Sequence, residues 1–330
     1  MSRIAVLGAG AWGTALSISL ARRGGHRIAL WSHSEPLAEQ MTETGENLHY
    51  LPGYTVPFDV LVTADPVAAI FEAEMVVLVT PSEHLRAVLA QVAPVLERDQ
   101  VIVSATKGLE ETSLLRMSQV VASIAGNACC VLSGPSFAAE VAAGIPTAIV
   151  AASTAPGVAQ RVQREFGSPT LRLYTNDDVA GVELGGALKN VIALAAGVVH
   201  GLELGHNAGA ALVTRGIAEM TRLAVACGGR TQTLSGLSGL GDLVLTCTGS
   251  LSRNRSVGIE LGKGRALQEI LAGLNGRVAE GIRSTTAALG LAARYEVEMP
   301  ITEQMDAILH RGKSPKEAIR ELMARPGRDE

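Results

Sequence analysis

The first half of the chain alternates short apolar, β-branched runs with segments of helical spacing, whereas the second half has an almost wholly helical pattern. The strand-like runs lie at residues 4–7, 27–31, 60–63, 75–80, 101–105, 130–132 and 147–151. Such alternation predicts βαβ units around a doubly wound parallel sheet. After Asn176, long segments rich in alanine, leucine and glycine follow at helical spacing. The remainder of the chain is therefore predicted to be all α-helical.

This change of pattern predicts two domains, an α/β domain over residues 1–178 and a helical domain over residues 179–330. The length of 330 residues agrees with two domains of ordinary size. Near the end, Ser314 and Pro315 precede Glu317. An N-cap serine, a proline at the first helical position and a glutamate two residues later predict the start of a last helix there.

Composition and charge exclude several classes of protein. With 47% hydrophobic and 18% charged residues, the chain is too apolar to be disordered. The net charge of −4 and the aromatic content of 3% provide no electrostatic or stacking surface for nucleic acid. We therefore expect no nucleic-acid partner.

The cysteines and the uncharged N-terminal run indicate where in the cell the protein is expected. Cys129, Cys130, Cys227 and Cys247 show no C-x-x-C spacing and no nearby histidine pair, so the sequence predicts neither a metal site nor a disulfide framework. Reduced thiols in a cytoplasmic protein are expected. The uncharged run 4–21 carries three glycines and a tryptophan where a secretory segment has leucines, so it is read as folded protein and no membrane span is expected.

Gly8, Gly10 and Gly13 form a G-x-G-x-x-G pattern directly after the first predicted strand. A helix predicted to run to about Arg23 follows them. In this context the first glycine permits a tight turn, the second lets the backbone approach a pyrophosphate, and the third lets the helix pack on the sheet. The pattern predicts a dinucleotide site with the pyrophosphate at the helix N-terminus.

The second predicted strand ends at Trp31, followed by Ser32, His33 and Ser34. An NAD-selective site presents a carboxylate to the ribose 2′-hydroxyl at this point. No carboxylate lies among these residues, so NADPH is expected to be accepted at least as well as NADH. His33 either contacts the 2′-phosphate or is merely exposed.

Polar residues follow three of the predicted strands, at 80–82, 106–108 and 133–136. Ligands of doubly wound sheets lie beyond the carboxyl ends of the strands, so these segments are candidates for ligand contact. Lys107 belongs to the second of them and is one of only five lysines, the others being Lys189, Lys263, Lys313 and Lys316. Its place at a strand end favours contact with cofactor or substrate.

Lys189 lies in a helix that is apolar on nearly every side, so its side chain is predicted to be buried. Burial disfavours the ammonium and lowers the pKa of a lysine, which could then exchange a proton near neutral pH, as carbonyl reduction requires. The alternative is a lysine that extends along the helix to reach water. The neighbouring Asn190 favours the functional interpretation.

Two later segments carry candidate substrate groups. The glycine-rich stretch 236–242 lacks the G-K-S/T ending of a phosphate loop and is predicted to serve close helix packing, with Asp242 as its only ionisable residue. Ser252, Arg253 and Asn254 combine a hydroxyl, a guanidinium and an amide, a set suited to holding a phosphate by charge-assisted hydrogen bonds. Alone, this segment could also be an ordinary basic turn.

Taken together, six ordered segments resemble one family, the NAD(P)-dependent glycerol-3-phosphate dehydrogenases of bacterial type. The segments span nearly the whole chain: GAGAWGTAL at 8–16, ATKGLE at 105–110, LSGPSFAAEV at 132–141, ELGGALKNVIALAAG at 183–197, GLSGLGDLVLTCTGSLSRNRSVG at 236–258 and VAEGIRST at 278–285. The resemblance implies an NAD(P)-binding Rossmann domain followed by a helical substrate domain. It further implies reversible reduction of dihydroxyacetone phosphate to sn-glycerol 3-phosphate with NADPH or NADH, supply of phospholipid synthesis, and a homodimer.

The resemblance also assigns residues, with Lys189 as proton donor and acceptor. The residues that it places around the phosphorylated substrate are Lys107, Gly134, Ser136, Lys189, Asp242, Ser252, Arg253 and Asn254. It places near the cofactor Gly8, Gly10, Ala11, Trp12, Gly13, Ser32, His33, Tyr50, Lys107, Ala138, Arg253, Val278 and Glu280. Departures from the family pattern are Ala11 for serine, His33 for arginine and His206 for aspartate, and the first two weaken individual cofactor contacts.

Two alternatives remain at this point. A related hydroxy-acid reductase would also use a lysine followed by an asparagine on the first helix of its second domain. A non-catalytic NADPH-sensing module would have no need for Lys189 and Asp242 in apolar surroundings.

Overall fold

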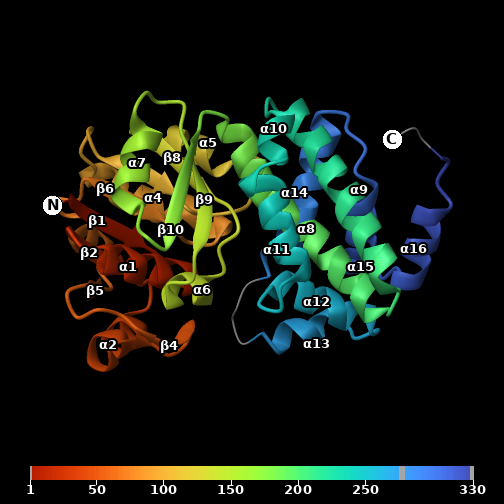
Figure 1. Cartoon of the computed structure of the whole chain (residues 1–330), viewed down its shortest axis with the longest axis horizontal. Coiled ribbons are helices and arrows are strands. Elements are labelled where there is room, and N and C mark those ends of the chain that lie inside the picture. The colour runs from red at the N-terminus through yellow and green to blue at the C-terminus, as the bar shows by residue number, and fades with distance from the viewer. Residues whose placement is uncertain (1, 275–278, 328–330) are drawn as a thin grey trace. The chain divides into compact units, whose positions relative to one another are not determined.

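The structure, a computed structural model, describes residues 2–274 and 279–327 (Figure 1). The chain divides into a first unit of residues 1–110 and 115–183 and a second unit of residues 111–114 and 184–330. The division falls after Glu183, inside helix α8 (Val179–Gly201) and close to the boundary at Asp178 that the sequence suggests. The Glu183 carboxylate accepts hydrogen bonds from Arg116 Nη1 at 2.5 Å and from the Ser118 N–H at 2.7 Å, which ties the first turns of α8 to the first unit.

The first unit contains an eight-stranded sheet in the order β10-β9-β8-β7-β6-β1-β2-β5. From β5 to β8 all neighbouring strands pair in parallel, the strand order of a dinucleotide-binding sheet. This confirms the predicted fold class. The strands are β1 (Ser2–Leu7), β2 (His26–Trp31), β5 (Leu61–Thr63), β6 (Met75–Leu78), β7 (Val101–Ser104), β8 (Cys129–Ser133), β9 (Thr147–Ala152) and β10 (Leu171–Asn176).

Helices cover both faces of this sheet because the central strands are apolar on both sides. In β1, Ile4 and Val6 belong to the core beneath α1, whereas Ala5 and Leu7 belong to the opposite core, which contains residues of α4 and α5. The helices of the unit are α1 (Ala11–Arg23), α2 (Glu35–Thr44), α3 (Pro66–Ile70), α4 (Ser82–Val92), the 3₁₀ turn η1 (Ala93–Val95), α5 (Met117–Ile124), α6 (Ala138–Ala143) and α7 (Val158–Phe166).

Two features of the sheet differ from the expectation. β9 runs antiparallel to β8, so the sheet is mixed, and the direction of a strand is not encoded in its run of apolar residues. A small hairpin of β3 (Glu46–Asn47) and β4 (Leu51–Thr55) was not predicted, because β4 contains a proline and a glycine and most of its residues are exposed.

The second unit is helical in its described residues (Figure 1). Besides most of α8 it contains α9 (Gly205–Ala226), α10 (Thr231–Leu234), the π-helical turn η2 (Leu237–Gly241), α11 (Asp242–Thr248), α12 (Arg253–Gly262), α13 (Leu267–Ala272), α14 (Glu280–Arg294), α15 (Pro300–His310) and α16 (Pro315–Met323). Among the described residues, α8 alone is long and apolar enough to cross a membrane, but 94% of its most apolar window is buried inside the protein, as in a core helix.

Glycines allow α8 and α12 to approach at main-chain distance. A Cβ on Gly258 would lie 2.9 Å from Gly197 Cα, and a Cβ on Gly262 would lie 3.0 Å from Gly201 Cα. Each helix therefore contributes two glycines four residues apart, so both contacts fall on one face. The predicted packing role of the stretch 236–242 is also confirmed, since a Cβ on Gly185 of α8 would lie 2.6 Å from the Ser238 carbonyl oxygen.

Side chains cap two of the last helices. Ser314 Oγ accepts a hydrogen bond from the Glu317 N–H at 3.2 Å, and Pro315 is the first residue of α16, as predicted. The Glu219 carboxylate, buried on α9, accepts from the N–H groups of Ile301 and Thr302 at 2.9 and 3.0 Å at the start of α15. A carboxylate at a helix N-terminus stabilises the helix through its unpaired N–H groups and its dipole.

Candidate active site

The glycine turn between β1 and α1 has the shape of a pyrophosphate site. Gly8 has a φ of +133°, and a Cβ there would lie 2.8 Å from the Val79 carbonyl oxygen, so only glycine fits. Around Gly10, the N-cap of α1, a Cβ would meet no described atom within 4 Å. No side chain caps α1, and no acidic residue lies in its first turn, which includes Ala11, Trp12 and Gly13. These uncapped N–H groups fit a dinucleotide phosphate.

Two further polar groups border this turn: Asn47, which the sequence did not indicate, and Thr80, which belongs to the candidate segment 80–82. Asn47 Nδ2 donates to the Ala9 carbonyl at 2.8 Å and to Thr14 Oγ1 at 2.9 Å, while its Oδ1 accepts from the Tyr50 N–H at 2.9 Å. Tyr50, a predicted cofactor residue, is thereby held next to the glycine turn. The Thr80 hydroxyl follows β6 beside Gly8 and is buried with no hydrogen-bond partner among the described residues.

At the end of β2 the predicted residues have different surroundings. Ser32 is buried, and its Oγ donates to the Ser34 carbonyl at 3.0 Å and accepts from the Ser34 N–H at 3.2 Å. His33 is exposed. The hydroxyl of Ser32 is thus already engaged by the backbone, and its contact with a cofactor remains a prediction, as does that of His33.

The ends of β7 and β8 bring three predicted substrate residues together. Lys107 Nζ donates to the Gly134 carbonyl at 3.1 Å, and Ser136 Oγ donates to the same oxygen at 3.0 Å. Gly134 has a φ of +142°, and a Cβ there would lie 3.0 Å from Ile149 Cα. Ala138, a predicted cofactor residue, begins α6, which packs on α1.

In the second unit, Lys189 of α8 meets Asp242 at the start of α11. Lys189 Nζ donates to Asp242 Oδ1 at 2.6 Å and to Thr246 Oγ1 at 2.8 Å, and only 9% of the lysine side chain and 1% of the aspartate side chain are exposed. The predicted burial of Lys189 is confirmed. Besides being buried, the Lys189 ammonium faces a carboxylate from another helix, a pairing that the sequence did not indicate.

Thr246 was not predicted, although a signal was available. It lies four residues after Asp242 on the same helix, the spacing that places two side chains on one face. Cys247, next to it, does not compete as an acid or base, because burial raises the pKa of its thiol to about 12.

The predicted phosphate segment begins α12. Ser252 Oγ caps this helix by accepting from the Arg255 N–H at 3.2 Å, and Arg253 is its first residue and is exposed. Asn254 is buried, with Nδ2 donating to Asn190 Oδ1 at 3.0 Å and Oδ1 accepting from the Gly281 N–H at 3.0 Å. Gly281 follows Glu280, the first residue of α14. Val278 lies outside the described residues.

Asn254 therefore differs in character from Arg253. The Gly281 N–H can only donate, so Oδ1 of Asn254 faces it, and the amide of Asn254 links α8, α12 and α14. One N–H of Asn254 is left for a ligand, whereas Arg253 is an exposed residue. Arg253 is the stronger candidate for direct phosphate contact.

Within the described residues, no group of three histidine, cysteine, aspartate or glutamate side chains is arranged to hold a metal ion, and no disulfide joins the four cysteines. Burial is the main cause that raises the pKa of Cys129 and Cys130, the latter to about 12.

The chain matches known proteins over its full length. Residues 3–159 match the family model for the N-terminus of NAD-dependent glycerol-3-phosphate dehydrogenase, and residues 178–320 match the model for its C-terminus. The chain is 60% identical to the glycerol-3-phosphate dehydrogenase [NAD(P)+] of Acidobacterium capsulatum, with 100% of both chains covered. The chain belongs to the NAD(P)-dependent glycerol-3-phosphate dehydrogenase family.

Solved structures agree with this family assignment. A crystal structure of glycerol-3-phosphate dehydrogenase from Coxiella burnetii is 41% identical, covers 98% of this chain and 99% of its own, and superposes with a TM-score of 0.95. A ketopantoate reductase from Ralstonia eutropha, at 15% identity and a TM-score of 0.61, covers 96% of this chain and 99% of its own and shares the fold alone. The chain thus resembles the reductase in fold alone, whereas it resembles the glycerol-3-phosphate dehydrogenases in both fold and sequence.

Proposed function

We propose that the chain catalyses the reversible reduction of dihydroxyacetone phosphate to sn-glycerol 3-phosphate. As a member of its family it is an oxidoreductase that acts on CH–OH donors and uses NAD(P). The observation that carries the proposal is the buried ammonium of Lys189, held at 2.6 Å from Asp242. A binding module has no use for such a pair, whereas a carbonyl reductase needs a proton donor of this kind.

When bound, NAD(P)H supplies the hydride that the substrate carbonyl carbon accepts. The residues that would hold it are Gly8, Gly10, Ala11, Trp12 and Gly13 of the glycine turn, where uncapped N–H groups receive the pyrophosphate. Tyr50 is linked to this turn through Asn47. Lys107 follows the end of β7, and Ala138 begins α6, the helix that packs against α1.

Lys189 would protonate the substrate oxygen as negative charge develops on it. The Asp242 carboxylate and the Thr246 hydroxyl accept hydrogen bonds from Nζ and fix its position. In the oxidation direction the neutral amine would accept the hydroxyl proton, and Asp242 would stabilise the ammonium that forms.

Arg253 would hold the substrate phosphate at the N-terminus of α12. Its guanidinium can make two parallel hydrogen bonds to phosphate oxygens, and the helix dipole favours an anion there. Ser252 keeps this helix end in place by capping it, and the amide of Asn254 fixes α12 against α8. In the first unit, Lys107, Gly134 and Ser136 lie together at strand ends and remain predicted substrate residues.

In the cell, reduction would supply sn-glycerol 3-phosphate for glycerophospholipid synthesis, by a cytoplasmic homodimer. This cellular role, location and oligomeric state are inferred from the family resemblance alone.

The test is the loss of NADPH or NADH absorbance after dihydroxyacetone phosphate is added to the purified chain. Oxidation of the cofactor that depends on this substrate supports the proposal. Binding of the cofactor without turnover would instead favour a sensing module. Equal turnover of a 2-oxo acid that lacks phosphate would favour a hydroxy-acid reductase.

A further inference from the structure

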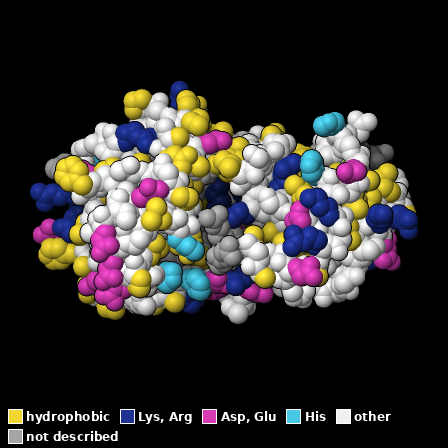
Figure 2. Space-filling model, turned by 90° about the horizontal axis from the view of Figure 1, so that it is seen from below, with side chains coloured by type: hydrophobic (Ala, Val, Ile, Leu, Met, Phe, Trp, Pro, Cys, Tyr) yellow, Lys and Arg dark blue, Asp and Glu magenta, His cyan; other side chains and the backbone are white. Residues whose placement is uncertain are grey.

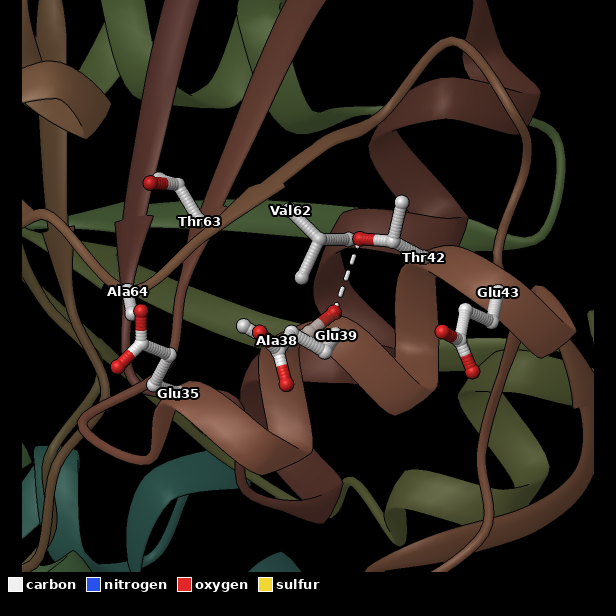
Figure 3. Close-up of a pocket in the computed structure, with 8 residues that line it drawn as sticks. All are labelled: Glu35, Ala38, Glu39, Thr42, Glu43, Val62, Thr63 and Ala64. Carbon is white, nitrogen blue, oxygen red and sulfur yellow. Dashed lines mark hydrogen bonds between the residues drawn. The ribbon is translucent and has the colours of Figure 1, made fainter.

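The carboxyl end of β2, where a dinucleotide-binding sheet recognises the adenosine ribose, is acidic in this chain. Glu35 is the first residue of α2, four positions after the last residue of β2, and its side chain is exposed. It lines a groove between α2 and the end of β5 together with Val62, Thr63 and Ala64. Figure 3 shows the Glu35 carboxylate on the side of Thr63 and Ala64.

This groove lies level with the end of β2. The strands β2 and β5 run parallel with Trp31 beside Thr63, and the Ser32 N–H donates to the Thr63 carbonyl at 2.9 Å. Glu35 therefore lies beside the end of β2, four residues after the strand end that usually carries a ribose-binding carboxylate. The sequence analysis predicts use of NADPH because Ser32, His33 and Ser34 include no carboxylate. Glu35, the next residue, was not part of that prediction.

No cation compensates this carboxylate from the same part of the chain. The sequence contains no lysine or arginine between Arg27 and Arg86, a stretch that includes the end of β2, all of α2, the β3–β4 hairpin and β5. Glu39 and Glu43 add negative charge along α2, and Glu46 lies in the adjoining β3. Figure 2 shows acidic side chains gathered at the left of the view, the side on which Figure 1 draws α2.

The N-terminus of α2 does not replace the missing cation. A helix N-terminus attracts a phosphate through its unpaired N–H groups. In α2, Pro36 has no N–H, the Leu37 N–H is bonded to Ser34 Oγ, and the Ala38 N–H is bonded to the Ser34 carbonyl. Glu35 supplies the single remaining N–H of the first turn and also the negative charge.

We propose that Glu35 determines cofactor selectivity, accepting a hydrogen bond from the ribose 2′-hydroxyl of NADH and disfavouring the 2′-phosphate of NADPH. This inference rests on the dinucleotide use given under the proposed function. A 2′-phosphate carries nearly two negative charges, and a carboxylate within about 6 Å at a solvated surface repels it enough for a preference on the order of tenfold.

The experiment compares the Kd of NADH and of NADPH for the full chain by fluorescence titration at about 0.1 M salt. The parent should bind NADH about tenfold more tightly, and Glu35→Gln should reduce this ratio to near unity. The matched control is Glu43→Gln, which removes the same charge from the same helix. Glu43 lies eight residues, or about 12 Å, further along α2, beyond the Debye length of about 10 Å at 0.1 M salt, so its ratio should stay within about twofold of the parent.

Three results would overturn the inference: binding of NADPH by the parent as tight as that of NADH, an unchanged ratio in Glu35→Gln, or equal changes in the two variants. Turnover of dihydroxyacetone phosphate is measured in parallel. Selective binding of NADH without turnover would support the role of Glu35 and overturn the proposed reaction, so the two failures are distinguishable.

Discussion

Replacing Lys189 with methionine should abolish most of the activity and also weaken the fold. Methionine keeps much of the apolar stem and removes the ammonium, so the substrate oxygen loses its proton donor. General acid–base catalysis contributes about 100-fold or more, and we expect turnover to fall by at least that factor. NADH binding should persist, because the glycine turn belongs to the other unit.

The effect on stability follows from the burial of the pair. With 1% of its side chain exposed, the Asp242 carboxylate would lose the ammonium that faces it at 2.6 Å. Removing one partner of a buried ion pair costs about 3–5 kcal/mol of unfolding free energy. The double variant Lys189→Met with Asp242→Asn removes both charges and should recover most of that loss. Urea unfolding of the two single variants and the double variant measures this coupling.

The control is Lys263→Met, the same substitution at a lysine whose side chain is 56% exposed and paired with Glu260 on the surface. It should leave turnover and stability close to those of the parent. Turnover of Lys189→Met within a few-fold of the parent would refute the assigned proton transfer. Equal destabilisation of the single and double variants would refute the argument from the buried charge.

Three further predictions concern other parts of the second unit. Arg253→Lys should lower kcat/KM for dihydroxyacetone phosphate much more than for unphosphorylated dihydroxyacetone, because an ammonium cannot reproduce two parallel hydrogen bonds; equal losses for both substrates would remove Arg253 from the phosphate site. Gly258→Ala should cost about 1–3 kcal/mol of unfolding free energy and lower kcat, because its Cβ would lie 2.9 Å from Gly197 Cα, whereas Gly126→Ala, with no described atom within 4 Å, should not. Burial raises the pKa of Glu219, although the hydrogen bonds from Ile301 and Thr302 act in the opposite direction. The contribution of Glu219 to stability is therefore complete at pH values below its ordinary pKa of 4.5, and it is lost as pH rises through the higher pKa of the folded state. The difference in unfolding free energy between the parent and Glu219→Gln should therefore shrink as pH rises in urea titrations, and a difference that grows with pH would contradict this reasoning.

The parts of the fold that the sequence predicted are those written in local pattern. Strand β1, the glycine turn and α1 follow one another within a short segment, and each requires particular residues at fixed spacing, so position and role could be read together. The cap of α16 by Ser314 is local in the same way. By contrast, nothing in the apolar run of β9 records that its neighbour β8 runs in the opposite direction.

For the candidate site, the sequence could propose residues one by one but could not give their arrangement. Lys189 and Asp242 were each recognisable as charged residues in apolar surroundings, yet they lie on different helices and no local spacing links them. Asn254 is predicted to contact the phosphate because it follows Arg253, and this stays a prediction. Its contacts with Asn190 and Gly281 could not be predicted, because they depend on how three helices pack. Glu35 was overlooked because the expectation stopped at the strand end and did not include the first turn of the next helix.

The glycine contact between α8 and α12 has a mechanical consequence. Where side chains separate two helices, they can change rotamer and so absorb a small displacement of one helix. At Gly197 with Gly258 and at Gly201 with Gly262 the main chains are in direct contact, so no side chain can adjust in this way. The helix that carries Lys189 and the helix that begins with Arg253 should therefore move together as one rigid body. The distance between Lys189 and Arg253 should therefore vary less than the distance between residues on helices that are separated by side chains.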